Sequence, residues 1–183
     1  VAALAPKTSA QQRGLLYEAH DYALLSKAAN AVFLMTYEWG YTYGEPQAIA
    51  PLPQVRAVLD YALSVTAGEN IFLGAPLYAY DWPLPYEKGR TRAETLSSQA
   101  AVARARLVGA EIEFDETAQA PYYHYFDKMR REHVVWFEDA RSLRAKIALA
   151  AEKGLQGIGF WQAGRELAQA WPLLDALVTL ETL

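Results

Sequence analysis

The stretch Ile71-Phe-Leu-Gly-Ala-Pro76 is an unbroken apolar run that follows the polar and turn-forming residues Gly68-Glu-Asn70 and ends at a proline. A strand with one face in solvent alternates apolar and polar residues, whereas a parallel strand covered on both faces reads as a continuous apolar run. Three further runs have this character: Val1–Ala5, Ala31–Tyr37 and Gly157–Trp161. The sequence therefore predicts a parallel sheet of four strands.

Segments with helical periodicity separate these strands. In Gln54–Val65 the apolar residues recur every three or four positions, which places them on one face of a helix. Helices are also predicted at Tyr17–Asn30, Ser142–Lys153 and Trp171–Leu180. Because strands alternate with helices as in βα units, the predicted fold class is α/β.

A long segment interrupts this alternation between the third and fourth strands. Asp81–Trp136 contains a predicted helix at Ser97–Leu107 and β-like runs at Ala110–Phe114, Tyr122–Phe126 and His133–Phe137. It is predicted to be a small α+β subdomain. Since it starts where the third strand ends, it stands at the edge of a parallel sheet where loops form the binding crevice. We expect it to form a wall of a substrate groove.

Length and composition limit the class of protein. The 183 residues suffice for one ordinary domain but not for a complete eight-stranded α/β barrel, which needs about 250 residues. With 52% hydrophobic residues, the chain is expected to bury a substantial core. Aromatic residues make up 13%; such side chains often line carbohydrate clefts, and burial in the core is an equally good explanation for each of them.

The charge and the lack of cysteine exclude several kinds of partner. The net charge is −4 and the basic residues are scattered, so no nucleic-acid partner is predicted. No run approaches the ~18–20 apolar residues of a membrane-spanning helix, so no membrane span is predicted. The absence of cysteine removes disulfides and thiolate ligands, while leaving the compartment undecided.

No pattern in the sequence predicts a metal or a cofactor. His20, His124 and His133 lack metal-ligand spacing. The segment Ala5-Pro-Lys-Thr8 lacks the glycines of a phosphate-binding loop, and Gly157-x-Gly159 has no third glycine at a helix start. Nucleotide binding is therefore not expected.

Four motifs occur in an order that is similar to that of a known family. They are Met35-Thr-Tyr-Glu-Trp39, Leu73-Gly-Ala-Pro-Leu-Tyr78, Trp136-Phe-Glu-Asp139 and Gly154-Leu-Gln-Gly-Ile-Gly-Phe-Trp161. Together they resemble the family 18 glycoside hydrolases. More narrowly, Met35–Tyr43 and Pro76–Pro85 resemble the bacterial spore-cortex N-acetylglucosaminidases that often carry LysM modules.

The resemblance implies an eight-stranded TIM-type α/β barrel with a small α+β insertion between strands seven and eight. The four apolar runs would be strands five to eight, so the chain resembles the C-terminal half of the catalytic barrel. Residues 1–80 would hold strands five to seven with their helices, residues 81–136 the insertion, and residues 137–183 the seventh helix, strand eight and the final helix.

The catalytic signature of that family is not found in this sequence. The family carries an Asp-x-x-Asp-x-Asp-x-Glu pattern on strand four, whose last Glu is the general acid, and the 183 residues contain no such pattern. The acidic cluster Glu111–Glu116 lacks the spacing and is predicted to be a solvated edge. Three explanations stay open: residues before Val1 were removed, a gene was split or shortened, or another chain supplies the acid.

The resemblance implies roles for three residues at strand ends. Tyr37 would position the substrate acetamide, whose own oxygen is the nucleophile in enzymes of this kind. Glu38, where many members have Asp, would accept hydrogen bonds from the sugar or the catalytic cluster. Trp161 would form the floor beneath the sugar. The alternatives are a packed tyrosine at the barrel rim for Tyr37 and a core indole for Trp161.

Further candidate contacts lie in the loops after strands six and seven. One or two of the aromatic residues in these loops are expected to contact sugar and the rest to pack; they are Trp39, Tyr41, Tyr43, Tyr78 and Trp82. Asp81 is a candidate for bonding sugar hydroxyls, with a turn carboxylate as the alternative. For Asp139, which precedes a predicted helix, we favour an N-cap.

Three functions are therefore considered. The first is part of a hydrolase of β-linked N-acetylglucosamine polymers, with peptidoglycan preferred over chitin, and with the chain alone inactive. The second is a carbohydrate-binding module without hydrolysis. The third is a half-barrel fragment that self-associates or pairs with the missing N-terminal half, because open strand edges and interior side chains need cover. The resemblance implies an exported protein of a bacterial spore or cell wall.

Overall fold

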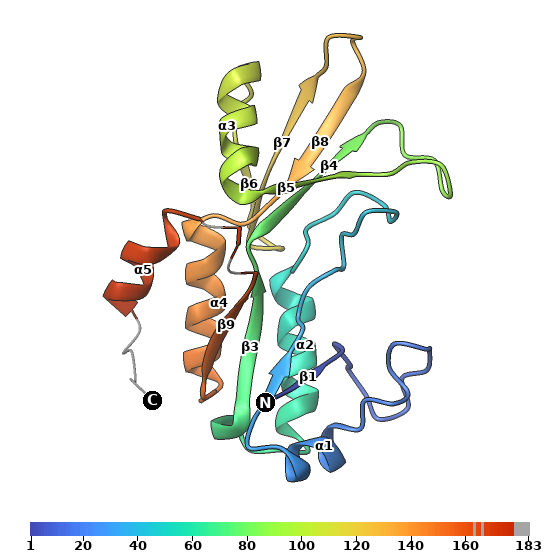
Figure 1. The fold of residues 1–183 in the computed structure, drawn as a ribbon. Helices are drawn as coiled ribbons and strands as arrows, with labels where there is room; N and C mark the ends of the chain where they lie inside the picture. The colour runs from blue at the N-terminus through green and yellow to red at the C-terminus, as the bar shows by residue number, and fades with distance from the viewer. Residues whose placement is uncertain (163, 166, 178–183) are drawn as a thin grey trace.

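A parallel four-stranded sheet forms the base of the structure, a computed structural model that describes residues 1–162, 164–165 and 167–177. Its strand order is β1-β2-β3-β9, with β1 at Ala2–Leu4, β2 at Val32–Leu34, β3 at Ile71–Pro76 and β9 at Gly157–Trp161 (Figure 1). Leu34 lies opposite Leu73, which lies opposite Ile158. The predicted parallel sheet is confirmed; β1 and β2 are shorter than the apolar runs that predicted them.

Helices follow the strands of this sheet in chain order. They are α1 (Tyr22–Ala28), α2 (Leu52–Leu63), α4 (Ala140–Glu152) and α5 (Ala170–Leu177), with a short 3₁₀ helix at Gly68–Asn70. The first helix begins later than predicted, because the Asp21 carboxylate accepts the Leu24 N–H at 2.9 Å and caps the helix there. The predicted end of the last helix at Leu180 lies outside the described residues.

The core lies between the parallel sheet and its helices. The predicted apolar face of α2 is buried through Val55, Val58, Leu59 and Ala62. These residues pack in one cluster with Leu34 and Leu73 of the sheet. Gly74 allows β2 and β3 to lie close, since a Cβ at this position would come within 2.4 Å of the Leu34 carbonyl oxygen.

The inserted segment forms a second, antiparallel sheet. Its strand order is β5-β4-β8-β7-β6, and α3 (Ser98–Val108) packs against it. The strands are β4 (Tyr78–Pro83), β5 (Glu94–Ser97), β6 (Glu113–Asp115), β7 (Ala120–Phe126) and β8 (Glu132–Trp136). Figure 1 shows this unit beyond the end of β3. The predicted helix and the runs at Tyr122–Phe126 and His133–Phe137 are confirmed, whereas the run at Ala110–Phe114 is a strand only from Glu113 on. Strands β4 and β5 were not predicted.

The chain passes from the parallel to the antiparallel sheet through a single residue. Leu77 alone separates β3 from β4, and its N–H donates to the Trp161 carbonyl oxygen of β9 at 2.8 Å. The antiparallel sheet therefore begins at Tyr78, upstream of Asp81, where the sequence placed the start of the insertion.

The return from the insertion is fixed by two polar contacts at the start of α4. Asp139 caps this helix by accepting the Ser142 N–H at 3.2 Å, which confirms the predicted N-cap. Beside it, the fully buried Lys146 ammonium lies 2.8 Å from the fully buried Glu138 carboxylate. Burial raises the pKa of Glu138, and the Lys146 charge opposes that rise.

Among the described residues, none of the helices is long and apolar enough to cross a membrane.

Candidate carbohydrate site at the strand ends

A cavity of about 270 Å³ opens where β2, β3 and β9 end. Tyr37, Glu38, Tyr78, Tyr80 and Trp161 line it, together with Met35, Thr95, Gln162 and Arg165. These residues come from the loop after β2, the start of β4, the edge strand β5 and the end of β9. The structure thus brings together four of the residues predicted from the sequence: Tyr37, Glu38, Tyr78 and Trp161.

The chain turns out of the sheet after β2 and so presents Tyr37 at its edge. The Thr36 N–H donates to the Leu34 carbonyl and the Tyr37 N–H to the Met35 carbonyl, at 2.9 and 2.8 Å, in place of sheet bonds. The Thr36 hydroxyl donates to the Gly74 carbonyl at 2.6 Å and ties the turn to β3. These local bonds explain why β2 is shorter than its apolar run.

Tyr37 is largely buried, and its hydroxyl makes no hydrogen bond to any residue that the structure describes. Its ring meets that of Tyr78 edge to face, with 6.4 Å between the centroids. Burial, with a contribution from the Glu38 charge, raises the pKa of Tyr37 to about 12. The phenol is therefore a protonated donor over the physiological range of pH.

Glu38 has an unusual backbone and two hydrogen-bond donors. Its φ of 73° lies in the left-handed region, which is uncommon for a residue other than glycine. The Tyr78 hydroxyl donates to Glu38 Oε1, and the Tyr80 hydroxyl donates to the same oxygen at 3.0 Å. Burial raises the pKa of Tyr80 to about 12, so this phenol also keeps its proton.

Trp161 is 52% exposed, whereas a core indole would be covered. It ends β9, pairs with Pro76 of β3 and lines the cavity with Arg165. The Arg165 guanidinium donates to the Leu96 carbonyl at 2.9 Å and so connects this side of the site to the insertion. An exposed indole in a concave site is suited to stacking on the apolar face of a sugar ring.

A second cavity of about 510 Å³ adjoins the first, because Met35, Tyr37 and Glu38 line both. The loop after β1 forms its other wall, with Gln12 and Tyr17 among the lining residues. Trp39, a predicted sugar contact, lies in this second cavity. The two hollows together form an extended concave surface along the ends of the parallel strands.

Trp82 has a packing role. Its side chain is fully buried, and its indole N–H donates to the Gly44 carbonyl at 2.9 Å. The loop after β2 thus covers Trp82, and its ring packs against that of Tyr80 with 5.5 Å between the centroids. The prediction that Trp82 contacts sugar is corrected, since no face of the indole reaches a cavity.

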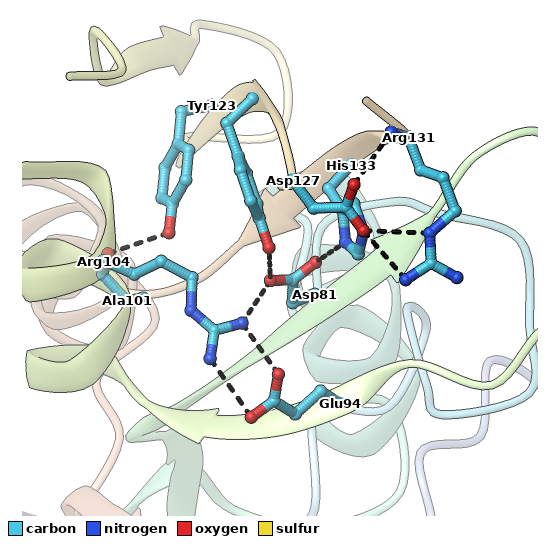
Figure 2. A network of polar contacts seen from close by, with 9 residues as sticks. Asp81, Glu94, Ala101, Arg104, Tyr123, Asp127, Arg131 and His133 are labelled. Carbon is cyan, nitrogen blue, oxygen red and sulfur yellow. Dashed lines mark hydrogen bonds and ion pairs between the residues drawn. The ribbon is translucent and has the colours of Figure 1, made fainter. Parts of the chain in front are cut away.

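Asp81 lies on the opposite face of the insertion, away from the cavity. It alternates along β4 with Tyr80 and Trp82, so its side chain points toward α3. The carboxylate is 1% exposed and pairs with Arg104 (Figure 2). It also accepts a hydrogen bond from the Tyr125 hydroxyl at 2.7 Å. The predicted sugar contact of Asp81 is therefore corrected to an internal one.

A histidine completes this network. Figure 2 shows His133 between two carboxylates, with its Nδ1 2.7 Å from Asp81 and its Nε2 3.6 Å from Asp127. Arg104 also binds Glu94 of β5 at 2.8 Å, which lowers the pKa of Glu94. The network connects α3 with β4, β5 and β8, so it stabilises the insertion and leaves the cavity-facing side to aromatic residues.

Tyr80, Thr95 and Arg165 line the cavity and were not predicted. The signal for Tyr80 was the spacing of Tyr78, Tyr80 and Trp82, which puts all three on one face of a strand. Thr95 and Arg165 carry no such signal, because their positions depend on pairing between distant segments. No group of three metal-ligating side chains occurs among the described residues.

A larger cavity of about 550 Å³ lies elsewhere, between the loop before α2 and the insertion. Pro46, Pro51, Pro53 and Trp136 are among the residues that line it. It contains none of the predicted site residues and no tyrosine hydroxyl. The smaller cavity at the strand ends has the polar groups that a specific site requires, so we take that one as the candidate site.

The tyrosines of the site predict a loss of stability in alkali. The folded state holds the protons of Tyr37 and Tyr80 up to a pKa of about 12, whereas an unfolded tyrosine ionises near pH 10. Their contribution is therefore complete below about pH 10 and is lost as the pH rises toward about 12. Chemical denaturation between pH 9 and 11.5 should show this decline, and it should be smaller in the Tyr37→Phe/Tyr80→Phe variant; equal slopes would contradict the assignment.

The fold and the site define an α/β protein with an aromatic, carboxylate-bearing site at the carboxyl ends of parallel strands. The family model for glycosyl hydrolases family 18 matches residues 2–166. The chain belongs to this family, as its four motifs implied.

The relatives include enzymes named for lysis of cortex and a chitobiase. The chain is 50% identical over 173 residues to the cortical fragment-lytic enzyme of Bacillus subtilis, covering 94% of this chain and 40% of the relative. It is similar to the crystal structure of the Bacillus cereus spore cortex-lytic enzyme SleL, with a TM-score of 0.93 and 45% identity over 97% of this chain and 41% of that one. Di-N-acetylchitobiase of Rattus norvegicus is 25% identical over 82% of this chain and 47% of its own length. The chain spans less than half the length of these proteins.

Proposed function

We propose that these residues form part of the catalytic barrel of a glycoside hydrolase that cleaves β-linked N-acetylglucosamine polymers. The observation that carries this proposal is the convergence of Tyr37, Glu38 and an exposed Trp161 on one cavity at the ends of parallel strands. Peptidoglycan is the preferred substrate, since a relative of 50% identity is named a cortical fragment-lytic enzyme and a solved structure of 45% identity is named a spore cortex-lytic enzyme. Chitin is the alternative, because an aromatic platform accepts either polymer.

The proposed reaction is substrate-assisted hydrolysis with retention. In enzymes of this kind the acetamide oxygen of the sugar attacks the anomeric carbon while a carboxylic acid protonates the leaving oxygen. The Tyr37 hydroxyl, which has no partner among the described residues, would donate to the acetamide and hold it for attack. Trp161 would stack beneath the ring. The acid would come from polypeptide other than these 183 residues.

We infer that β1, β2, β3 and β9 correspond to strands five to eight of an eight-stranded barrel. Their parallel order and the match to 41% of a longer solved structure support this assignment. Residues 1–80 would then carry strands five to seven, residues 81–136 the insertion, and residues 137–183 the last strand with its flanking helices. The observed start of the antiparallel sheet moves the first of these boundaries to Tyr78.

Binding of tetra-N-acetylchitotetraose to the 183-residue chain tests the site. We expect Trp161→Ala to weaken the association constant, measured by isothermal titration calorimetry, about 10- to 100-fold, through loss of a stacked ring worth roughly 1–3 kcal/mol. Trp171→Ala is the matched control, because this indole is 62% exposed and lines none of the cavities described above. Equal affinities of the two variants would contradict the role of Trp161.

A non-catalytic carbohydrate-binding module is the second candidate. It is favoured by the absence of the Asp-x-x-Asp-x-Asp-x-Glu pattern together with the presence of an aromatic cavity. Both candidates require binding of the tetrasaccharide. The two candidates can be distinguished in a longer polypeptide that includes a strand with this pattern. Only the hydrolase would then turn over substrate.

The edges of the parallel sheet predict self-association of the isolated chain. Within the described residues, β1 and β9 each pair with a strand on one side only, so their outer edges offer unpaired backbone groups. We propose that a second copy covers these edges. Light scattering coupled to size exclusion at micromolar concentration should give a mass above 20.4 kDa. A stable, folded monomer would contradict the proposal.

A further inference from the structure

The carboxylate of Glu38 is held by two tyrosines that come from another part of the chain. Tyr78 and Tyr80 belong to β4, and their side chains lie on the same face of that strand because they are two residues apart. Both hydroxyls donate to one oxygen, Oε1. Among the described residues nothing bonds to Oε2, and Glu38 lines both adjoining cavities.

Glu38 needs such support because little else fixes it. The residue is exposed and sits in a turn with positive φ, where a glutamate side chain has several rotamers open to it. Tyr78 and Tyr80 are themselves fixed, since they are 5% and 6% exposed and their rings meet edge to face at 5.5 Å. Rigid donors thus hold a carboxylate that would otherwise move.

We infer that Tyr78 and Tyr80 are positioning residues that aim the second oxygen of Glu38 at the bound ligand. That oxygen would accept a hydrogen bond from a hydroxyl or an amide N–H of a neutral N-acetyl amino sugar. The inference rests on the proposed function for the ligand class. It reassigns Tyr78, which the sequence suggested as a direct sugar contact, to action through Glu38.

Tyrosine-to-phenylalanine changes separate this role from packing. Phenylalanine keeps the ring that packs against Tyr37 and Trp82 and removes only the hydroxyl that reaches Glu38. Glu38→Asn is the matching change on the other side, because the shorter side chain cannot reach the phenols and asparagine tolerates positive φ. Tyr86→Phe is the control; its hydroxyl donates to the Tyr43 carbonyl and the residue lines neither cavity of the site.

The test is a double-mutant cycle on binding of tetra-N-acetylchitotetraose, measured by isothermal titration calorimetry. We expect Tyr80→Phe to weaken binding about 10-fold and Glu38→Asn at least as much, because charge-assisted bonds orient the acceptor. In the Glu38→Asn background, Tyr80→Phe should change affinity less than twofold. A structural or direct role of Tyr80 would instead give the same loss in both backgrounds, and that result would overturn the inference.

Two further results keep the outcomes distinct. A parallel cycle on the thermal unfolding midpoint should show coupling between Tyr80 and Glu38, and additive shifts would overturn the hydrogen-bonded arrangement whether or not sugar binds. If the unchanged chain fails to bind the tetrasaccharide, the proposed function falls, and the ligand role of Glu38 falls with it. If the unchanged chain binds the tetrasaccharide and the Tyr80→Phe and Tyr86→Phe variants bind it with the same affinity, only the positioning role of Tyr80 is contradicted.

Discussion

Replacing Lys146 by methionine should lower the free energy of unfolding by about 3–5 kcal/mol, as found when one member of a buried ion pair is removed. Lys146 and Glu138 are both fully buried, with 2.8 Å between the ammonium and a carboxylate oxygen. Methionine fills similar space, so the loss reflects the uncompensated charge of Glu138 more than a cavity. Urea denaturation monitored by circular dichroism measures this difference.

The loss should depend on pH. Without Lys146, only the weaker effect of the Ser142 hydroxyl still opposes the rise in the pKa of Glu138 that burial causes, so the folded variant binds a proton more tightly than the unfolded chain does. The variant should therefore recover stability as the pH falls from 8 to 5. Glu138→Gln/Lys146→Met should be more stable than Lys146→Met alone at pH 8.

Lys153→Met is the control for Lys146→Met. Lys153 lies at the C-terminal end of α4, and its ammonium is 2.6 Å from the Asp60 carboxylate, which is 53% exposed. Pairs of this kind contribute roughly 0–1 kcal/mol. A loss for Lys146→Met no larger than that of Lys153→Met would show that the buried pair has no special part in holding α4 to the end of the insertion.

Tyr37→Phe should reduce kcat about 100- to 1,000-fold in a longer polypeptide that joins these residues to a strand carrying the general acid. The hydroxyl would bind the acetamide most strongly as charge develops on it, and removal of one such donor costs about this factor. KM should change little, because the ring and Trp161 still bind the sugar. Release of reducing ends from cortex peptidoglycan measures both parameters.

The Tyr37→Phe experiment needs two controls. Tyr43→Phe removes a phenol from an exposed loop position that lines neither cavity of the site, and it should keep full activity. The 183-residue chain by itself should release no reducing sugar, because the proposed acid lies elsewhere. A Tyr37→Phe enzyme with undiminished kcat would rule out the acetamide role, and turnover by the isolated chain would show that the acid is within it.

The parallel strands could be predicted because each is part of a continuous run of apolar residues. Ile71–Pro76 and Gly157–Trp161 have the predicted bounds. Ile71–Pro76 lies inside the sheet and needs apolar residues on each face, whereas Gly157–Trp161 is a half-buried edge strand that only its apolar run revealed. β4 and β5 were not predicted, for different reasons. β4 contains Asp81 on its covered face, and β5 is a short edge strand with polar residues.

The site was predictable only in part. Tyr37, Glu38 and Trp161 follow or end strands, so family motifs locate them along the chain and the fold brings them together. Asp81 was misplaced because the loop expected there is a strand, which sends its side chain to the face opposite Tyr80. Trp82 lies on the same face as Tyr80, but the loop after β2 covers it. The partners that bury both residues, Arg104 and Gly44, are distant in sequence and leave no local signal.

The one-residue connection at Leu77 has a mechanical consequence. A flap that closes over a substrate needs a few residues free to change their φ and ψ angles. Here β3 passes into β4 through Leu77, whose N–H is bonded to β9. The insertion is therefore expected to be stationary relative to the parallel strands. If the site widens or narrows for a bulkier glycan, the segments after β1 and β2 are expected to move instead.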